Sequence, residues 1–124
     1  MARILIAEDE EALRAFIARA VGQDGHDVVA TADGGEALEA LAREQGRFDL
    51  LLTDIRMPVM DGIALALAAA RDWPELTILL MTGYADQRER AHGLDALIHD
   101  VIAKPFSLND IRKAVAEALA VRGR

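Results

Sequence analysis

A fivefold alternation of short apolar runs with stretches of helical periodicity restricts the fold of this chain more than any other feature. The apolar runs predict buried strands at residues 4–7, 28–30, 50–52, 77–81 and 101–103. Helical spacing follows each run, and it is weakest over residues 86–97, where large apolar side chains are few. Strands and helices that alternate through short connections predict an α/β domain with a doubly wound parallel sheet and right-handed crossovers.

Polar residues mark where several of the helices begin. Asp33, Asp61 and Ser107 each precede an apolar-periodic stretch and are predicted to cap a helix. The acidic residues 8–11 favour a helix N-terminus after the first strand. Trp73 precedes a proline, and we therefore expect the third helix to end before it.

Composition excludes several classes of function. A chain of 124 residues, 52% hydrophobic and 28% charged, is long enough for one globular domain. Its net charge of −7 argues against a nucleic acid or an anionic membrane as partner. The absence of cysteine excludes disulfides and thiolate chemistry. The N-terminal apolar run is too short for a signal peptide, and residues 63–70 are too few to span a bilayer, so we expect a cytoplasmic protein.

Side chains that can carry chemistry stand at the ends of four predicted strands: Glu8 and Asp9, Asp54, Thr82, and Lys104. In an open α/β sheet these ends meet at one edge. Carboxylates that share a pocket repel one another unless cations are supplied, and oxygen ligands together with a lysine suit Mg²⁺. The pattern predicts a phosphoryl-transfer site in which Asp54 is the nucleophile. Thr82 and Lys104 would offer a hydroxyl and an ammonium group to the phosphate oxygens.

Other interpretations of these residues remain open at this point. A strand-end Asp is commonly a turn residue, acidic residues after a strand commonly cap a helix, and a lone Thr or Lys is commonly structural or solvated. A phosphatase of the haloacid dehalogenase type would need a second acid two residues after Asp54, where this chain has Arg56. A flavodoxin-like electron carrier would need a phosphate-binding loop where the acidic residues 8–11 would repel phosphate.

The chain resembles the receiver domain of bacterial two-component response regulators over essentially its whole length, residues 1–124. The motifs that carry the resemblance are Glu8-Asp9, Asp54 with Met57-Pro58 and Met60-Asp61-Gly62, Thr82-Gly83, and Lys104-Pro105-Phe106. The resemblance implies a flavodoxin-like (βα)5 fold of three layers with strand order 2-1-3-4-5. It also implies a single receiver domain, with a core of about residues 2–121 and no output domain.

The resemblance further assigns roles at the site. Asp54 would accept a phosphoryl group from a histidine of a partner kinase or phosphotransferase. Asp9, Asp54 and the backbone carbonyl of Arg56 would ligate Mg²⁺, with Glu8 acting through water, and the peptide bond before Pro105 would be cis. The protein would then not be an enzyme beyond taking a phosphoryl group from a donor and slowly losing it.

One position departs from the family pattern. Val101 stands three residues before the lysine, where most receivers carry an aromatic residue that changes rotamer as the site threonine moves toward the phosphate. Tyr84 follows Thr82 by two residues, and we hypothesise that it reports phosphorylation to the weak helix at 86–97. Arg56 and Tyr84 occupy positions that tune acyl phosphate hydrolysis in the family.

Residues 82–90, followed by 104–106, resemble the CpdR-type single-domain regulators. That resemblance implies an adaptor that controls proteolysis by the ClpXP protease, active when unphosphorylated, and a monomer or weak dimer. A phosphorelay intermediate that passes its phosphoryl group to another histidine-containing protein is the alternative function. The expected output surface comprises residues 86–97, the fifth strand and the last helix, and the first helix is the expected kinase-docking element.

Overall fold

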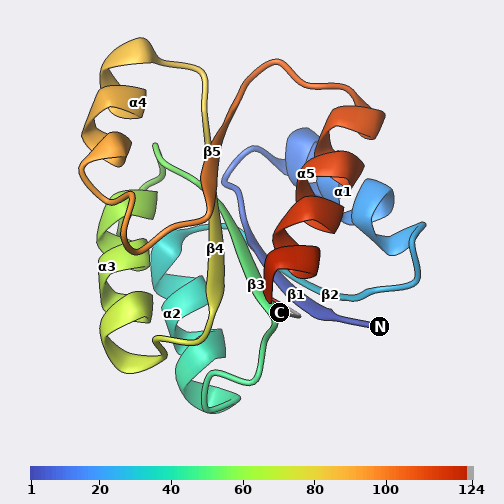
Figure 1. Ribbon diagram of the computed structural model, residues 1–124, viewed down its shortest axis with the longest axis horizontal. Coiled ribbons are helices and arrows are strands. Elements are labelled where there is room, and N and C mark those ends of the chain that lie inside the picture. Colours follow the sequence, from blue (N-terminus) through green and yellow to red (C-terminus); the bar gives the residue numbers. More distant parts are fainter. Residues whose placement is uncertain (123–124) are drawn as a thin grey trace.

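A sheet of five parallel strands forms the centre of the computed structural model, which describes residues 1–122 (Figure 1). Its strands are β1 (Arg3–Ala7), β2 (Asp27–Thr31), β3 (Leu50–Asp54), β4 (Thr77–Thr82) and β5 (Asp100–Ala103). They pair in the order β2-β1-β3-β4-β5, and every pair is parallel. The predicted α/β fold and strand order are therefore confirmed, and each strand is one or two residues longer than its apolar run.

Helices cover both faces of this sheet: α1 (Glu11–Gly22), α2 (Gly34–Arg43), α3 (Gly62–Asp72), α4 (Ala85–His92) and α5 (Leu108–Arg122). In Figure 1, α1 and α5 lie on one side of the sheet, and α2, α3 and α4 lie on the other. Alternate residues of β3 enter two cores: Leu51 packs with α2 and α3, whereas Leu50 and Leu52 pack with α1 and α5. A strand covered on both faces is apolar throughout, which is why the sequence shows continuous apolar runs.

The three predicted caps are present. Asp33, Asp61 and Ser107 each accept a hydrogen bond from the backbone N–H three residues later, at 2.8, 2.8 and 3.0 Å. Each bond satisfies an N–H group that has no partner within the helix. The starts of α2, α3 and α5 are thus determined by local sequence.

The predicted extent of the fourth helix is wrong, because α4 ends at His92 and residues 93–97 form turns. Ala91 is the one buried residue of α4 within the described part of the chain, and Leu97 remains 43% exposed. Too little apolar surface is available there to support a longer helix. Gly93, at the C-cap of α4, disfavours continuation further.

Within residues 1–122, no helix combines the length and the apolar character that crossing a bilayer requires.

Candidate functional site

The predicted site residues lie at the edge of the sheet where the strands end, at the top of Figure 1. Glu8 and Asp9 follow β1, Asp54 ends β3, Thr82 ends β4 and Lys104 follows β5. The order and register of the strands bring these ends side by side. This is the position at which α/β sheets hold their ligands.

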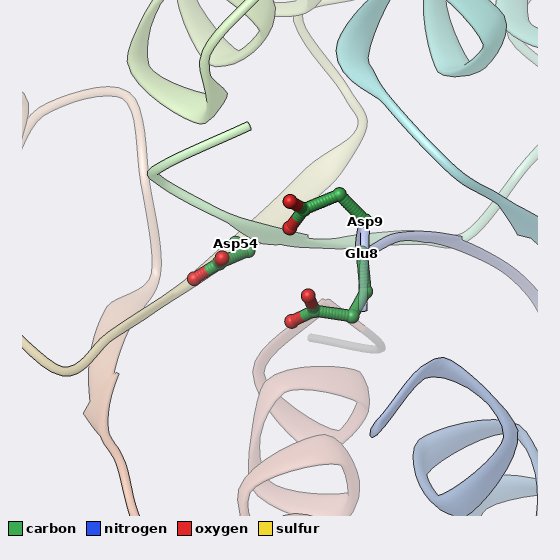
Figure 2. Close-up of side chains that lie close together, drawn as sticks. All are labelled: Glu8, Asp9 and Asp54. Carbon is green, nitrogen blue, oxygen red and sulfur yellow. The ribbon is translucent and has the colours of Figure 1, made fainter. Parts of the chain in front are cut away.

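Three carboxylates share one space at this edge, and Figure 2 shows Glu8, Asp9 and Asp54 with their carboxylates on a common side. One oxygen from each lies within 4.8 Å of the others. Glu8 is 1% exposed and Asp54 6% exposed, whereas Asp9 is exposed. The carboxylates open into a cleft of about 490 Å³. Its lining consists of Glu8, Asp9, Glu10, Asp54, Arg56, Gly83, Tyr84 and Lys104.

Helix capping does not account for the two acidic residues that follow β1. The N-cap of α1 is Glu10, whose side chain makes no capping hydrogen bond. Glu8 instead accepts a bond of 3.0 Å at Oε2 from the Glu10 N–H, while its Oε1 faces Lys104. The Glu8 carboxylate is therefore directed into the cleft.

Lys104 forms ion pairs with Glu8, which follows β1, and with Asp54, which ends β3. Its Nζ lies 3.0 Å from Glu8 Oε1 and 3.0 Å from Asp54 Oδ1. The Lys104 side chain is 22% exposed, so both ion pairs are largely withdrawn from solvent. A freely solvated lysine is thereby excluded as the interpretation of this residue. The Lys104–Pro105 peptide bond is cis.

The pKa values at the site reflect the burial of its carboxylates and the negative charge they share. Burial raises the pKa of Asp54, and the opposing hydrogen bond and charge of Lys104 do not restore it. Burial likewise raises the pKa of Glu8, and the charge of Asp54 adds to this rise. Burial alone would lower the pKa of Lys104, but its hydrogen bonds to Asp54 and Glu8 raise it instead. Lys104 thus does not fully offset the burial of Asp54 and Glu8, and the pKa values of both carboxyl groups stay above their ordinary values.

This donor set fits a Mg²⁺ ion. All of the clustered ligand atoms are carboxylate oxygens, which Mg²⁺ prefers, and nitrogen or sulfur ligands typical of transition metals do not occur in the cluster among the described residues. A divalent cation would also supply the positive charge that the cluster lacks.

Thr82 is held away from the cleft. Its hydroxyl lies 2.9 Å from Gln87 Oε1 on α4, and it accepts a hydrogen bond of 3.1 Å from the Tyr84 N–H. Among the residues that the structure describes, those lining the acidic cleft do not include Thr82. The sequence offered no signal for Gln87, since a polar residue in the first turn of an exposed helix is unremarkable by itself.

Comparison with known proteins agrees with this geometry. The family model of the response regulator receiver domain matches residues 4–116. The chain belongs to this family. The receiver is 39% identical over 119 residues to the response regulator receiver protein CpdR of Brucella abortus, and the match covers 96% of this chain and 98% of CpdR.

Other relatives of the receiver differ in length. Response regulator MprA of Mycobacterium leprae is 37% identical over 88% of this chain but only 47% of MprA, so the receiver spans about half of that relative. A solved CheY-like receiver domain protein from Methanospirillum hungatei has a TM-score of 0.89 at 29% identity, and the match covers 99% of this chain and 97% of that one. Both comparisons place the chain among the receivers of two-component signalling.

Two further residues of the receiver, Arg56 and Tyr84, meet above the cleft that both help to line. The guanidinium carbon of Arg56 lies 5.1 Å from the centre of the Tyr84 ring, a cation–π arrangement. Tyr84 is 50% exposed, whereas Val101 is buried in the core that contains Ala91 of α4. The buried side chain at this position of β5 is therefore aliphatic, whereas most receivers carry an aromatic residue there.

Proposed function

We propose that this receiver accepts a phosphoryl group on Asp54 from a phosphohistidine of a partner kinase or phosphotransferase. The observation that carries the proposal is a buried strand-end carboxylate that shares a cleft with Glu8 and Asp9 and lies 3.0 Å from Lys104 Nζ. An Asp54 oxygen would attack phosphorus, and the phosphorus–nitrogen bond would break. Its electron pair would remain on the imidazole, which takes up a proton, and the product on Asp54 would be an acyl phosphate.

The chain's own residues would neutralise the transferred group. Lys104 reaches Asp54 Oδ1 already and would offer its ammonium to one phosphoryl oxygen. Glu8, Asp9, Asp54 and the backbone carbonyl of Arg56 would hold Mg²⁺, which when bound supplies positive charge to the phosphoryl oxygens. Thr82 would donate its hydroxyl hydrogen to a further phosphoryl oxygen once it turns toward the cleft.

Turnover of other phosphorylated substrates is not part of the proposal. A phosphatase of the haloacid dehalogenase type needs a general acid two residues after its nucleophile, and here Arg56 occupies that position. The Arg56 guanidinium stacks on Tyr84, and a guanidinium offers hydrogen-bond donors but no acceptor. We propose that these two side chains limit the access of water to the acyl phosphate, which would be lost only slowly.

The proposed output is control of ClpXP-type proteolysis, by a single-domain adaptor in the cytoplasm that works as a monomer or weak dimer. Its support is the similarity to CpdR, of whose length the match covers 98%. We propose α4, β5 and α5 as the surface that contacts the downstream partner, and α1 as the element that docks the kinase. Tyr84, at the N-cap of α4, would report the state of Asp54 to this surface.

The test begins with phosphorylation. The protein is incubated with acetyl phosphate, with and without Mg²⁺, and an added phosphoryl group is measured by intact mass. We expect Mg²⁺-dependent modification of the wild type and none of Asp54→Asn, with Asp72→Asn as a control because Asp72 pairs with Arg71 on the exposed surface. The absence of Asp54-dependent modification would overturn the proposal.

A second arm separates the two proposed outputs. Purified ClpX is mixed with phosphorylated and unphosphorylated protein, and binding is measured in each state. A difference between the states supports the adaptor. Transfer of the phosphoryl group to a histidine phosphotransferase, without any binding to ClpX, supports the phosphorelay intermediate instead.

A further inference from the structure

We propose that Gln87 is a positioning residue, a latch that holds α4 to Thr82 until a phosphoryl group on Asp54 competes for the same hydroxyl. The inference rests on the proposed function, since it concerns how phosphorylation of Asp54 reaches α4. The first residue to respond to phosphorylation would then be a polar side chain on α4. In most receivers an aromatic residue on β5 has that role, and here Val101 occupies its position.

The argument begins with the hydrogen-bonding capacity of Thr82. A hydroxyl group has one hydrogen to donate. Thr82 is 3% exposed, and its Oγ1 lies 2.9 Å from Gln87 Oε1 and accepts one hydrogen bond from the Tyr84 N–H at 3.1 Å. The Tyr84 carbonyl, at 3.3 Å, is the more distant second acceptor. The single Thr82 hydrogen is therefore committed to Gln87 in the unmodified protein.

The attachment of α4 makes this bond important. Within the described chain, Ala91 in the last turn is the one residue of α4 that is buried. Its N-cap residue, Tyr84, makes no capping hydrogen bond with its side chain. Its link to α3 is a long ion pair of 3.8 Å between Arg90 and Asp61, whose side chains are 57% and 38% exposed, and such pairs contribute little. Gln87 is half-buried and is bonded to the end of β4, so it fixes the first turn of the helix.

Competition follows from this arrangement. A phosphoryl oxygen on Asp54 that takes the Thr82 hydrogen leaves Gln87 Oε1 without its donor. The first turn of α4 then loses the side-chain hydrogen bond between Gln87 and Thr82, and the packing of Ala91 and the contact of the Tyr84 N–H remain. Conversely, the latch opposes phosphoryl binding, because the Gln87 bond has to break first. Phosphorylation and the attachment of α4 are in this way coupled through one hydrogen.

The experiment compares the wild type with Gln87→Met, which keeps the length of the side chain and removes the acceptor. Beryllofluoride with Mg²⁺ serves as the phosphoryl probe, and its affinity is measured together with amide hydrogen exchange at residues 88–92. Without the probe, we expect exchange to be about two- to fivefold faster in Gln87→Met than in the wild type. This range corresponds to the loss of one hydrogen bond, partly offset because the Thr82 hydroxyl can turn to the Tyr84 carbonyl instead. We expect the probe to bind Gln87→Met tighter by a similar factor, and to accelerate exchange only in the wild type.

Three further variants isolate the latch from a general weakening of the helix. Glu89→Met places the same side chain on the exposed face of α4 and should leave both measurements unchanged. Gln87→Glu retains an acceptor and should restore slow exchange. In a Thr82→Val background, which lacks the hydroxyl, Gln87→Met should have no additional effect on exchange.

The results distinguish the latch from the function on which it rests. If the wild type binds beryllofluoride through Asp54 but Gln87→Met changes neither exchange nor affinity, the latch is wrong and the proposed function stands. Faster exchange in Gln87→Met that persists undiminished in the Thr82→Val background also overturns the latch. If the wild type does not bind the probe, the proposed function is wrong, and the competition at Thr82 is overturned with it.

Discussion

Asp54→Asn should make the protein more stable at neutral pH in the absence of Mg²⁺. The substitution preserves the shape of the side chain and an acceptor oxygen for Lys104, and it removes one negative charge from the cluster. The pKa of Asp54 is raised in the folded protein, chiefly by burial. The charged form of this carboxylate is therefore less stable in the folded state than in the unfolded chain.

The magnitude follows from three opposing contributions. At an effective dielectric constant of about 20, a carboxylate oxygen within 4.8 Å of Asp54 repels it by about 3.5 kcal/mol or more. The exposed Asp9 adds less than the buried Glu8, because solvent screens it. Lys104, at 3.0 Å, attracts Asp54 by about 5.5 kcal/mol. The repulsion and the attraction nearly cancel. The sign of the change in stability is therefore determined by the desolvation penalty of the Asp54 charge, part of which Asp54→Asn recovers. We expect the free energy of unfolding to rise by about 1–2 kcal/mol.

The dependence on pH gives the prediction a second test. The folded state holds the Asp54 proton more tightly than the unfolded state, so wild-type stability falls as the pH rises from the unfolded-state pKa through the raised folded-state pKa. Asp54→Asn lacks this loss. The advantage of Asp54→Asn should be fully present above the folded-state pKa and should shrink as the pH falls through it.

Urea unfolding with a chelator present measures this difference, and the expected gain corresponds to a rise of about 3–8 °C in Tm. Asp72→Asn is the matched control and should change little, since its partner Arg71 is adjacent and exposed. Added Mg²⁺ should stabilise the wild type more than Asp54→Asn and so narrow the gap. A variant no more stable than the wild type at neutral pH, or one whose advantage grows in acid, would refute the argument from burial and charge.

Three other substitutions test separate parts of the site. Lys104→Met removes the cation between two buried carboxylates, so the free energy of unfolding in urea should fall by about 1–3 kcal/mol at neutral pH and recover partly in acid. Tyr84→Ala removes the ring on which Arg56 stacks, so the acyl phosphate should be lost several-fold faster, as followed by intact mass. That factor corresponds to the free energy of one exposed cation–π contact. Gly62→Ala would place a Cβ 2.0 Å from the Asp54 carbonyl oxygen, so the backbone must shift, at a cost of about 1–3 kcal/mol in the same unfolding assay.

Each of these has its own control. Lys104→Arg keeps the charge and should lose less stability than Lys104→Met. Tyr84→Phe keeps the ring and should retain the phosphoryl group as the wild type does. If Tyr84→Ala leaves phosphorylation intact and partner binding unaltered, Tyr84 does not report the state of Asp54. Gly22→Ala should be close to neutral, because a Cβ at Gly22 meets no atom within 4 Å, and a loss equal to that of Gly62→Ala would contradict the steric argument.

What the sequence predicts correctly depends on local rules. Continuous apolar runs indicate strands buried on both faces, and the alternation with helices requires a parallel sheet, which brings residues as distant as Glu8 and Lys104 to one edge. The caps at Asp33 and Ser107 follow from short-range hydrogen bonds that the residue types specify. These features need no knowledge of packing distances.

The features that sequence reasoning missed depend on tertiary geometry. Gly62 reads as a turn residue, yet its necessity comes from the backbone of Asp54, which leaves no space for a Cβ. The bond between Gln87 and Thr82 requires a particular rotamer at the end of β4 and the position of α4, neither of which residue spacing specifies. The end of α4 was misjudged because Leu94 and Leu97 fit a helical period, yet Leu94 is only partly buried against the core and Leu97 is 43% exposed.

The sparsely buried helix α4 and the acidic cleft lie at the same edge of the sheet. Burial disfavours the charged forms of Glu8 and Asp54, so a cation that entered the cleft would stabilise the folded protein. A well-buried α4 would not respond to the small free energy of one hydrogen bond at Thr82. An element with little buried surface, attached through Gln87 to a group beside the charged cluster, can respond to it. Low burial in α4 is therefore a requirement of the proposed signalling, and added apolar contacts there should diminish the response to phosphorylation.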